Sequence, residues 1–266
     1  MKEIVPRQAI QKAISLGDFW VNLIMKLLKI KELNKIYDTI YPSQGLELVE
    51  KILQQMNIRI FLKEQSKLCD ILQQGPFITI SNHPFGFLDG LTSILLIRKI
   101  RPDYKVTANF LLQQLEPLKD FFIFVNPFDD KKHQGMGGTT QCLEHLAKGG
   151  SVGLFPAGEV STYYRGQKGV SDRPWPLSPI RLIQKAQVPV LPLYFHGQNS
   201  RLFHLAGKIH PLLRTVRLPA EFLRKRNSMV KVTTGHLILP ETIQKYQDLK
   251  ELQEFLRESV YSLENC

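Results

Sequence analysis

Apolar residues recur at helical spacing along the first 56 residues of the chain. Within residues 19–30 the apolar positions, Trp20 among them, alternate with Lys26 and Lys29. This pattern is typical of an amphipathic basic helix, which either packs on the core of a domain or lies on a membrane surface. The pattern fits both alternatives, and residues 1–56 are predicted to be a helical segment that associates with membrane.

Beyond residue 58, short apolar runs alternate with longer amphipathic ones. We expect strands at 77–80, 104–106, 121–125, 151–155, 188–195 and 230–239, and helices at 91–99, 111–119, 139–148, 178–185 and 249–262. Residues 162–179 contain three prolines and two glycines and are expected to be the least regular. The order predicts an α/β fold with a mixed central sheet flanked by helices. Residues 1–266 would form a single domain, with an α/β core at 57–266.

The composition narrows the class of protein. Hydrophobic residues make up 43% and charged residues 22%, which excludes a disordered chain. The three cysteines, Cys69, Cys142 and Cys266, are scattered, so neither a disulfide scaffold nor a metal site is expected, and a reducing cytosolic setting fits best. No apolar run reaches the roughly 20 residues of a membrane-spanning helix. Residues 1–7 lack the apolar stretch of a secretory signal.

The charge is strongly basic and unevenly distributed. There are 35 Lys and Arg against 24 Asp and Glu, a net charge of +11. Between residues 199 and 231, eight bases face the single acid Glu221, and Arg224, Lys225 and Arg226 form a run. A basic face suits an anionic membrane or a nucleic acid, or it serves solubility alone. No nucleic-acid-binding signature accompanies the bases, so nucleic-acid binding would rest on charge alone.

Residues that could carry chemistry lie in three segments, 82–90, 155–161 and 188–200, each associated with a predicted strand. In α/β sheets, sites gather at the carboxyl ends of the strands. The first segment runs from Asn82 to Gly90 and contains His83 and Asp89. A neutral imidazole can take a proton from a hydroxyl, while a carboxylate fixes its tautomer. Gly86 would let the intervening loop fold tightly. Alternatively, Asp89 only caps the following helix and His83 is an ordinary loop histidine.

The three segments, taken with residues 121–128, resemble the glycerolipid (lysophospholipid) acyltransferase superfamily. Asn82-His83-Pro84-Phe85-Gly86-Phe87-Leu88-Asp89-Gly90 resembles its His-x4-Asp motif, Phe155-Pro156-Ala157-Gly158-Glu159-Val160-Ser161 its F-P-E-G-x-x-S motif, and Val188-Pro189-Val190-Leu191-Pro192 its V-P-V/I-x-P motif. The similarity covers roughly residues 77–197. It is strongest to the hemolysin-like or ornithine-lipid branch, in which the first motif is commonly N-H-P-x-G-x-x-D-G.

The resemblance implies transfer of a fatty acyl group from an acyl carrier protein or coenzyme A thioester to the hydroxyl of a lyso-lipid. His83 would be the general base and Asp89 its orienting partner, with no covalent acyl-enzyme. Backbone N–H groups near Gly158 would stabilise the oxyanion. The residues implied to bind substrate are Asn82, Gly86, Phe155, Pro156, Gly158, Glu159, Ser161 and Pro189.

The same resemblance gives expectations about partners and location. No cofactor is expected beyond the acyl-ACP or acyl-CoA co-substrate, and the partners would be an anionic bilayer, a lyso-lipid acceptor and an acyl carrier protein, but no nucleic acid. The enzyme would be peripheral, on the cytoplasmic face of the membrane, without a transmembrane helix. The residues expected to bind membrane are Trp20, Lys26, Arg224, Lys225 and Arg226.

Two departures from the family pattern concern the pair and the headgroup. Five residues separate His83 from Asp89 instead of four, and Gly86 would absorb the extra residue in a bulged turn. Ala157 and Val160 replace the glutamate and the base of the phosphate-binding motif, and Glu159 would suit a cationic or zwitterionic headgroup or would only position its loop. Arg165 or Lys168 remains a source of positive charge.

Two other functions fit parts of the pattern. A non-catalytic lipid-binding protein with the same fold would use the basic and amphipathic segments without the pair. A nucleic-acid-binding module would use the charge alone.

Overall fold

A computed structural model of the chain describes residues 3, 11, 18–27, 29–63, 75–109, 112–113, 115–125, 137–164 and 169–266. The chain divides into two compact units, which are taken separately below. The first unit comprises Met1–Arg59, Gln114–Lys119 and Asn199–Met229, and the second comprises Ile60–Gln113, Asp120–Gln198 and Val230–Cys266. Residues 199–229 therefore group with the N-terminal helices.

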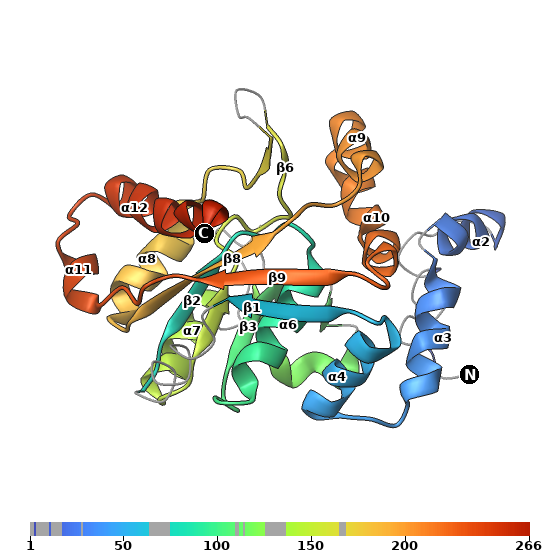
Figure 1. Cartoon of the computed structure of the whole chain (residues 1–266), viewed down its shortest axis with the longest axis horizontal. Coiled ribbons are helices and arrows are strands. Elements are labelled where there is room, and N and C mark those ends of the chain that lie inside the picture. The colour runs from blue at the N-terminus through green and yellow to red at the C-terminus, as the bar shows by residue number, and fades with distance from the viewer. Residues whose placement is uncertain are drawn as a thin grey trace. The chain divides into compact units, whose positions relative to one another are not determined.

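A mixed sheet forms the centre of the second unit (Figure 1). Within the described residues its strand order is β1-β9-β8-β2-β5-β3-β4. The strands are β1 (Arg59–Lys63), β2 (Ile78–Ser81), β3 (Lys105–Asn109), β4 (Phe122–Val125), β5 (Val152–Leu154), β8 (Val190–His196) and β9 (Met229–Thr234). The strands from β8 to β4 pair in parallel, whereas β9 pairs antiparallel with β8. The predicted mixed sheet with flanking helices is confirmed.

One hydrophobic core covers a face of this sheet. Alternate residues of the central strands, such as Ile80 and Leu154, pack with α7 (Gly138–Ala147), α8 (Leu177–Ala186) and α12 (Leu249–Tyr261). All four residues of β2 are buried, as expected for a central parallel strand covered on both sides. Helix α6 (Phe87–Arg98) contacts β3, and the short α11 (Pro240–Gln244) precedes α12.

Several elements differ from the prediction. Strand β9 ends at Thr234, where Gly235 follows, and beyond it only Ile238 pairs, as a single bridge to Val190. The expected helix at 111–119 is a short 3-10 helix, η2 (Glu116–Phe121), while residues 111 and 114 lie outside the described part. The segment expected to be least regular contains a small antiparallel pair, β6 (Thr162–Tyr163) and β7 (Val170–Ser171).

Helices make up the first unit. They are α2 (Asp18–Leu27), α3 (Ile30–Ile40), α4 (Gly45–Gln55), α9 (Arg201–Ile209) and α10 (Pro211–Arg224). Residues 201–224, predicted only to be a basic stretch, form two of these helices. Among the described helices, none combines the length and the apolar character needed to span a bilayer.

The parallel pairing explains where the site forms. Strands β2, β5 and β8 run in the same direction, so their carboxyl ends lie at one edge of the sheet. The loops that leave this edge begin at Asn82, Phe155 and Gly197, the same segments that carry the candidate chemistry.

Candidate active site

His83 and Asp89 meet at this edge despite the extra residue between them. The distance from His83 Nδ1 to Asp89 Oδ2 is 3.0 Å, with the Asp89 side chain fully buried and the His83 side chain 18% exposed. With Nδ1 turned toward the carboxylate, Nε2 is the ring nitrogen that carries the lone pair in the neutral tautomer. The geometry is that of a histidine oriented by a carboxylate.

Gly86 makes the five-residue spacing workable. Its φ is +79°, in the region that favours glycine, and it immediately precedes α6. Asp89 therefore lies at the third position of the helix, and its Oδ2 accepts the backbone N–H groups of Phe85 (2.8 Å) and Gly86 (2.9 Å). The two readings of Asp89 are thus combined, because the carboxylate both satisfies the start of α6 and faces His83.

Burial dominates the electrostatics of Asp89. Removal of the carboxylate from water raises the pKa of Asp89, and the His83 ring and the two backbone N–H donors oppose this rise in part. The ionised form of Asp89 therefore depends on His83 and the two backbone donors for its stabilisation.

The loop after β5 holds His83 in place. The Phe155 ring stacks on the imidazole with 4.1 Å between ring centroids, and the N–H of Ser161 donates to the carbonyl oxygen of His83 at 2.9 Å. Pro156 is buried in the same loop. The N–H of Gly158, which has φ +69°, donates to Phe155 O at 2.9 Å. The Gly158 amide is therefore engaged in a turn and the Ser161 amide in the bond to His83, whereas oxyanion stabilisation by other N–H groups of this loop stays a prediction.

Asp172 is a second buried carboxylate at this site, and the sequence reading missed it. Its Oδ1 accepts from Ser161 Oγ at 2.6 Å and from the N–H of His83 at 3.2 Å, and its Oδ2 accepts from Trp175 Nε1 at 3.0 Å. Its own N–H donates to Tyr261 Oη at 2.7 Å. Burial raises the pKa of Asp172, against these donors and the nearby imidazole. Asp172 thereby ties the His83 loop, the Ser161 loop and α12 together.

Glu159 faces a base that the motif comparison did not include. Arg173 Nε lies 3.5 Å from Glu159 Oε1 and donates to Ala157 O at 2.9 Å. Tyr164 Oη also donates to Glu159 Oε1, at 3.0 Å. Positive charge is therefore present beside this loop even though Ala157 and Val160 replace the family residues. Arg165 and Lys168 lie outside the described residues.

Two predicted substrate-binding residues have other places. Both polar atoms of Asn82 are used by β8, because Nδ2 donates to Phe195 O at 2.9 Å and Oδ1 accepts from Phe195 N at 2.7 Å. Pro189 O accepts from the N–H of Ile78 at the amino-terminal start of β2 and β8. Pro189 is thus at the opposite end of the strands from His83, and the structure does not bring it to the site.

The residues expected to bind membrane belong to the first unit. Lys26 is exposed in α2, and the side chain of Trp20 is outside the described part. Arg224 and Arg226 are exposed at and just after the end of α10, while Lys225 is half-buried.

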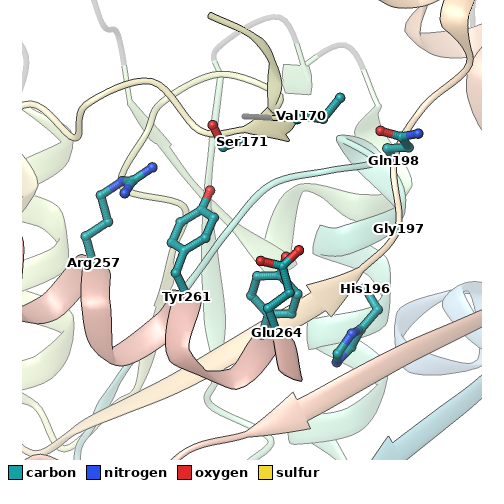
Figure 2. Close-up of a pocket in the computed structure, with 10 residues that line it drawn as sticks. Val170, Ser171, His196, Gly197, Gln198, Arg257, Tyr261 and Glu264 are labelled. Atoms are coloured by element: carbon teal, nitrogen blue, oxygen red, sulfur yellow. The ribbon is translucent and has the colours of Figure 1, made fainter. Parts of the chain in front are cut away.

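A pocket of about 610 Å³ lies between the end of β8, strand β7, and α12 with the C-terminal residues that follow it (Figure 2). Its lining includes Ser171, His196, Arg257 and Glu264. Ser171 precedes Asp172, and a Cβ on the lining residue Gly197 would come 2.7 Å from the Phe85 ring. Burial and Lys231 both lower the pKa of His196, so this wall favours a neutral imidazole. The pocket offers both a cation and an anion to a polar group.

The protein is an α/β protein in which a histidine faces a buried carboxylate at the carboxyl edge of the sheet. This arrangement is typical of enzymes that use acid–base chemistry. The sequence profile of the family described as Acyltransferase matches residues 4–266. The chain belongs to this family and is an acyltransferase.

No curated protein matches the chain. Among solved structures, the chain is similar to the 1-acyl-sn-glycerophosphate (LPA) acyltransferase PlsC from Thermotoga maritima, with 12% sequence identity, a TM-score of 0.49, and coverage of 98% of this chain and 97% of that one.

Proposed function

We propose that this acyltransferase moves a fatty acyl group from an acyl carrier protein or coenzyme A thioester to the hydroxyl of a lyso-lipid, either a lysophospholipid or a lyso-ornithine lipid. The observation that carries the proposal is the 3.0 Å approach of His83 Nδ1 to the buried Asp89 carboxylate. The family membership and the order of the three motifs support it.

In this mechanism His83 is the general base. The acceptor hydroxyl gives its proton to His83 Nε2 while its oxygen attacks the thioester carbonyl, and Asp89 stabilises the imidazolium that forms. The tetrahedral intermediate collapses with cleavage of the carbon–sulfur bond, and the proton on Nε2 passes to the departing thiolate. The products are an ester and a free thiol.

Direct attack by the acceptor agrees with the state of two side chains that could otherwise form an acyl-enzyme, Ser161 and Cys142. Ser161 Oγ donates to Asp172 and is buried, so it does not face the His83 ring as an activated serine would. Cys142 belongs to the hydrophobic core, and burial raises the pKa of its thiol to about 12. A thiol with such a pKa is a poor nucleophile at neutral pH.

The headgroup of the acceptor is proposed to lie near Glu159 and Arg173. An acidic and a basic side chain beside one another suit a zwitterionic headgroup, whereas Glu159 alone would suit a cationic one. We place the enzyme on the cytoplasmic face of an anionic membrane, because its net charge of +11 favours association with anionic lipid.

The experiment is turnover of long-chain acyl thioesters with a panel of lyso-lipids, followed by thiol release. The expected result is thiol release that depends on the acceptor. His83→Ala and Asp89→Asn should each lower kcat by about a hundredfold to ten-thousandfold, since each removes the general base or its orientation. The matched controls are the exposed residues His236 and Asp120, so His236→Ala and Asp120→Asn should keep the wild-type rate.

Two outcomes would contradict the proposal. Unchanged rates in both pair variants would remove His83 and Asp89 from the chemistry. Vesicle binding without turnover on any acceptor would favour a non-catalytic lipid-binding protein instead.

A further inference from the structure

Helices α9 and α10 expose a set of large apolar side chains. Ten such side chains are exposed in the described part of the chain, and five of them lie on these two helices. They are Leu202 (55% exposed), Leu205 (54%), Ile209 (79%), Leu213 (43%) and Val216 (43%). We refer to these five residues as the apolar face. Burial would remove the free-energy cost of holding so much apolar surface in water.

The spacing shows that the apolar face belongs to the outer side of the helices. Leu202, Leu205 and Ile209 follow one another by three and four residues, which places them on one side of α9. The buried residue Phe203 lies on another side, and α9 and α10 contact one another (Figure 1). The two helices approach closely where a Cβ on Gly207 would lie 3.2 Å from Arg214 Cδ.

The exposed charges on α9 and α10 themselves have one sign. The only acid in α9 and α10 is Glu221, which is 1% exposed. Ser200 donates to it through both N–H and Oγ, and Arg217 and Arg224 lie 3.7 Å and 3.9 Å from its carboxylate oxygens. The carboxylate is thus turned inward, while Arg201 and Lys208 are exposed on α9. An apolar side flanked by bases, with no exposed acid, complements an anionic lipid surface.

We propose that the apolar face of α9 and α10 inserts into the interface of an anionic bilayer and docks the enzyme there. The identity of the lipid substrate rests on the proposed function, but the binding itself does not. Among the described side chains of α2, in contrast, Val21 and Met25 are buried. Insertion of Ile209, beside the turn between α9 and α10, would bury the most exposed of the five side chains.

The test uses sedimentation of the full chain with vesicles of phosphatidylcholine alone or mixed with phosphatidylglycerol. The test variant is Leu205→Gln with Ile209→Gln, which removes apolar surface without changing charge. The matched control is Leu239→Gln in the other unit, since Leu239 is 50% exposed against 54% for Leu205. We expect the double variant to bind mixed vesicles at least about tenfold more weakly than the wild type. The control should bind as the wild type does.

Other readouts separate the alternatives. The double variant should keep the thermal unfolding of the wild type and its turnover of detergent-dispersed lyso-lipid, because neither residue is part of the catalytic loops. Equal vesicle binding by wild type and double variant would overturn the proposal. So would a wild-type dimer in solution that the double variant converts to a monomer, since a second copy would then cover the face. Vesicle binding that is lost in the double variant, in a chain without any turnover, would leave this proposal standing and reject the proposed function.

Discussion

The loops around His83, proposed above as the catalytic loops, and the α9–α10 helices depart in opposite ways from the usual burial of apolar side chains and exposure of charged ones. Around His83, two carboxylates, Asp89 and Asp172, are buried at the edge of a sheet. On α9 and α10, large apolar side chains are exposed, Ile209 most of all. Each arrangement opposes the stability of the isolated protein, because burial penalises charge and water penalises apolar surface.

The two regions compensate these costs differently. In the catalytic loops the compensation is internal, since Asp172 accepts three hydrogen bonds and Asp89 accepts two and faces an imidazole. On the apolar face, no comparable partner is present in the described part of the chain, and a surface outside the chain would supply it. The difference agrees with the two proposals, chemistry in the first region and contact with a surface in the second.

The largest effect outside the pair is expected from Asp172→Asn. Asparagine offers one acceptor oxygen where Asp172 uses two, so a donor from His83, Ser161 or Trp175 loses its partner. We expect kcat to fall by about 10- to 100-fold with little change in KM, because the change acts through the position of His83. Steady-state kinetics with one acceptor measures both constants.

Ser161→Ala provides a milder form of the same experiment. It removes only the 2.6 Å hydrogen bond to Asp172 and leaves the backbone bond from Ser161 to His83. A smaller fall in kcat than for Asp172→Asn is expected. A rise in KM with unchanged kcat in both variants would mean that Asp172 serves substrate binding and does not position His83.

Gly86→Ala should affect the fold of the catalytic loop. At φ +79° an alanine is strained, and a residue held in such a conformation costs about 1–3 kcal/mol. We expect the free energy of unfolding to fall by about that amount, and kcat to fall with it because Gly86 N–H would leave Asp89. Urea unfolding gives the first quantity. Wild-type stability in Gly86→Ala would show that the loop tolerates the extra residue without glycine.

Most of the loop that contains His83 and Asp89 could be predicted from the sequence, because its parts are close together along the chain. A strand, a turn with glycine and a helix start bring His83 and Asp89 together within seven residues, so their approach could be predicted. Asp172 could not be predicted in the same way. It lies 89 residues from His83, in a segment whose prolines and glycines indicate irregular structure, and only the folded chain brings it to the loop.

Two other differences have similar causes. Pro189 directly precedes β8, whose first three residues complete the motif, so Pro189 falls at the end of the strand away from His83. In residues 201–224, Leu202, Leu205 and Ile209 recur at helical spacing among several bases. Which side of a helix faces the core depends on its neighbours, so the exposed fraction of these side chains required the structure.

The pH dependence should have opposite signs for stability and activity. Burial raises the folded-state pKa of Asp89 above that of the unfolded chain, so folding favours its protonated form. The stabilising contribution is fully present below the ordinary aspartate pKa and is lost as pH rises through the raised value. It amounts to about 1.4 kcal/mol for each pH unit between the two pKa values. Activity instead rises over this range, because His83 needs the ionised partner.

Asp89→Asn isolates this contribution, since asparagine does not titrate. The free energy of unfolding of the wild type minus that of Asp89→Asn should decrease as pH rises through this window, measured by urea unfolding at several pH values. Asp172 shifts in the same direction, but it is present in both proteins and cancels in the difference. A difference that increases with pH would mean that His83 and the backbone donors outweigh burial.

The smallest effect, and the one that sharpens the comparison most, concerns single charges beside α10. Reversal of Arg224, Lys225 and Arg226 together should weaken vesicle binding, but Arg224 also lies 3.9 Å from the buried Glu221, so its reversal would place two carboxylates together.

Arg226 is exposed and avoids this difficulty. Arg226→Gln should weaken binding to anionic vesicles about fivefold, near 1 kcal/mol, and lose this effect at high salt. Turnover of detergent-dispersed substrate should not change. If the charge change proved as large as the loss of Leu205 and Ile209 and persisted in salt, docking would depend on a specific headgroup contact and the apolar face would be secondary.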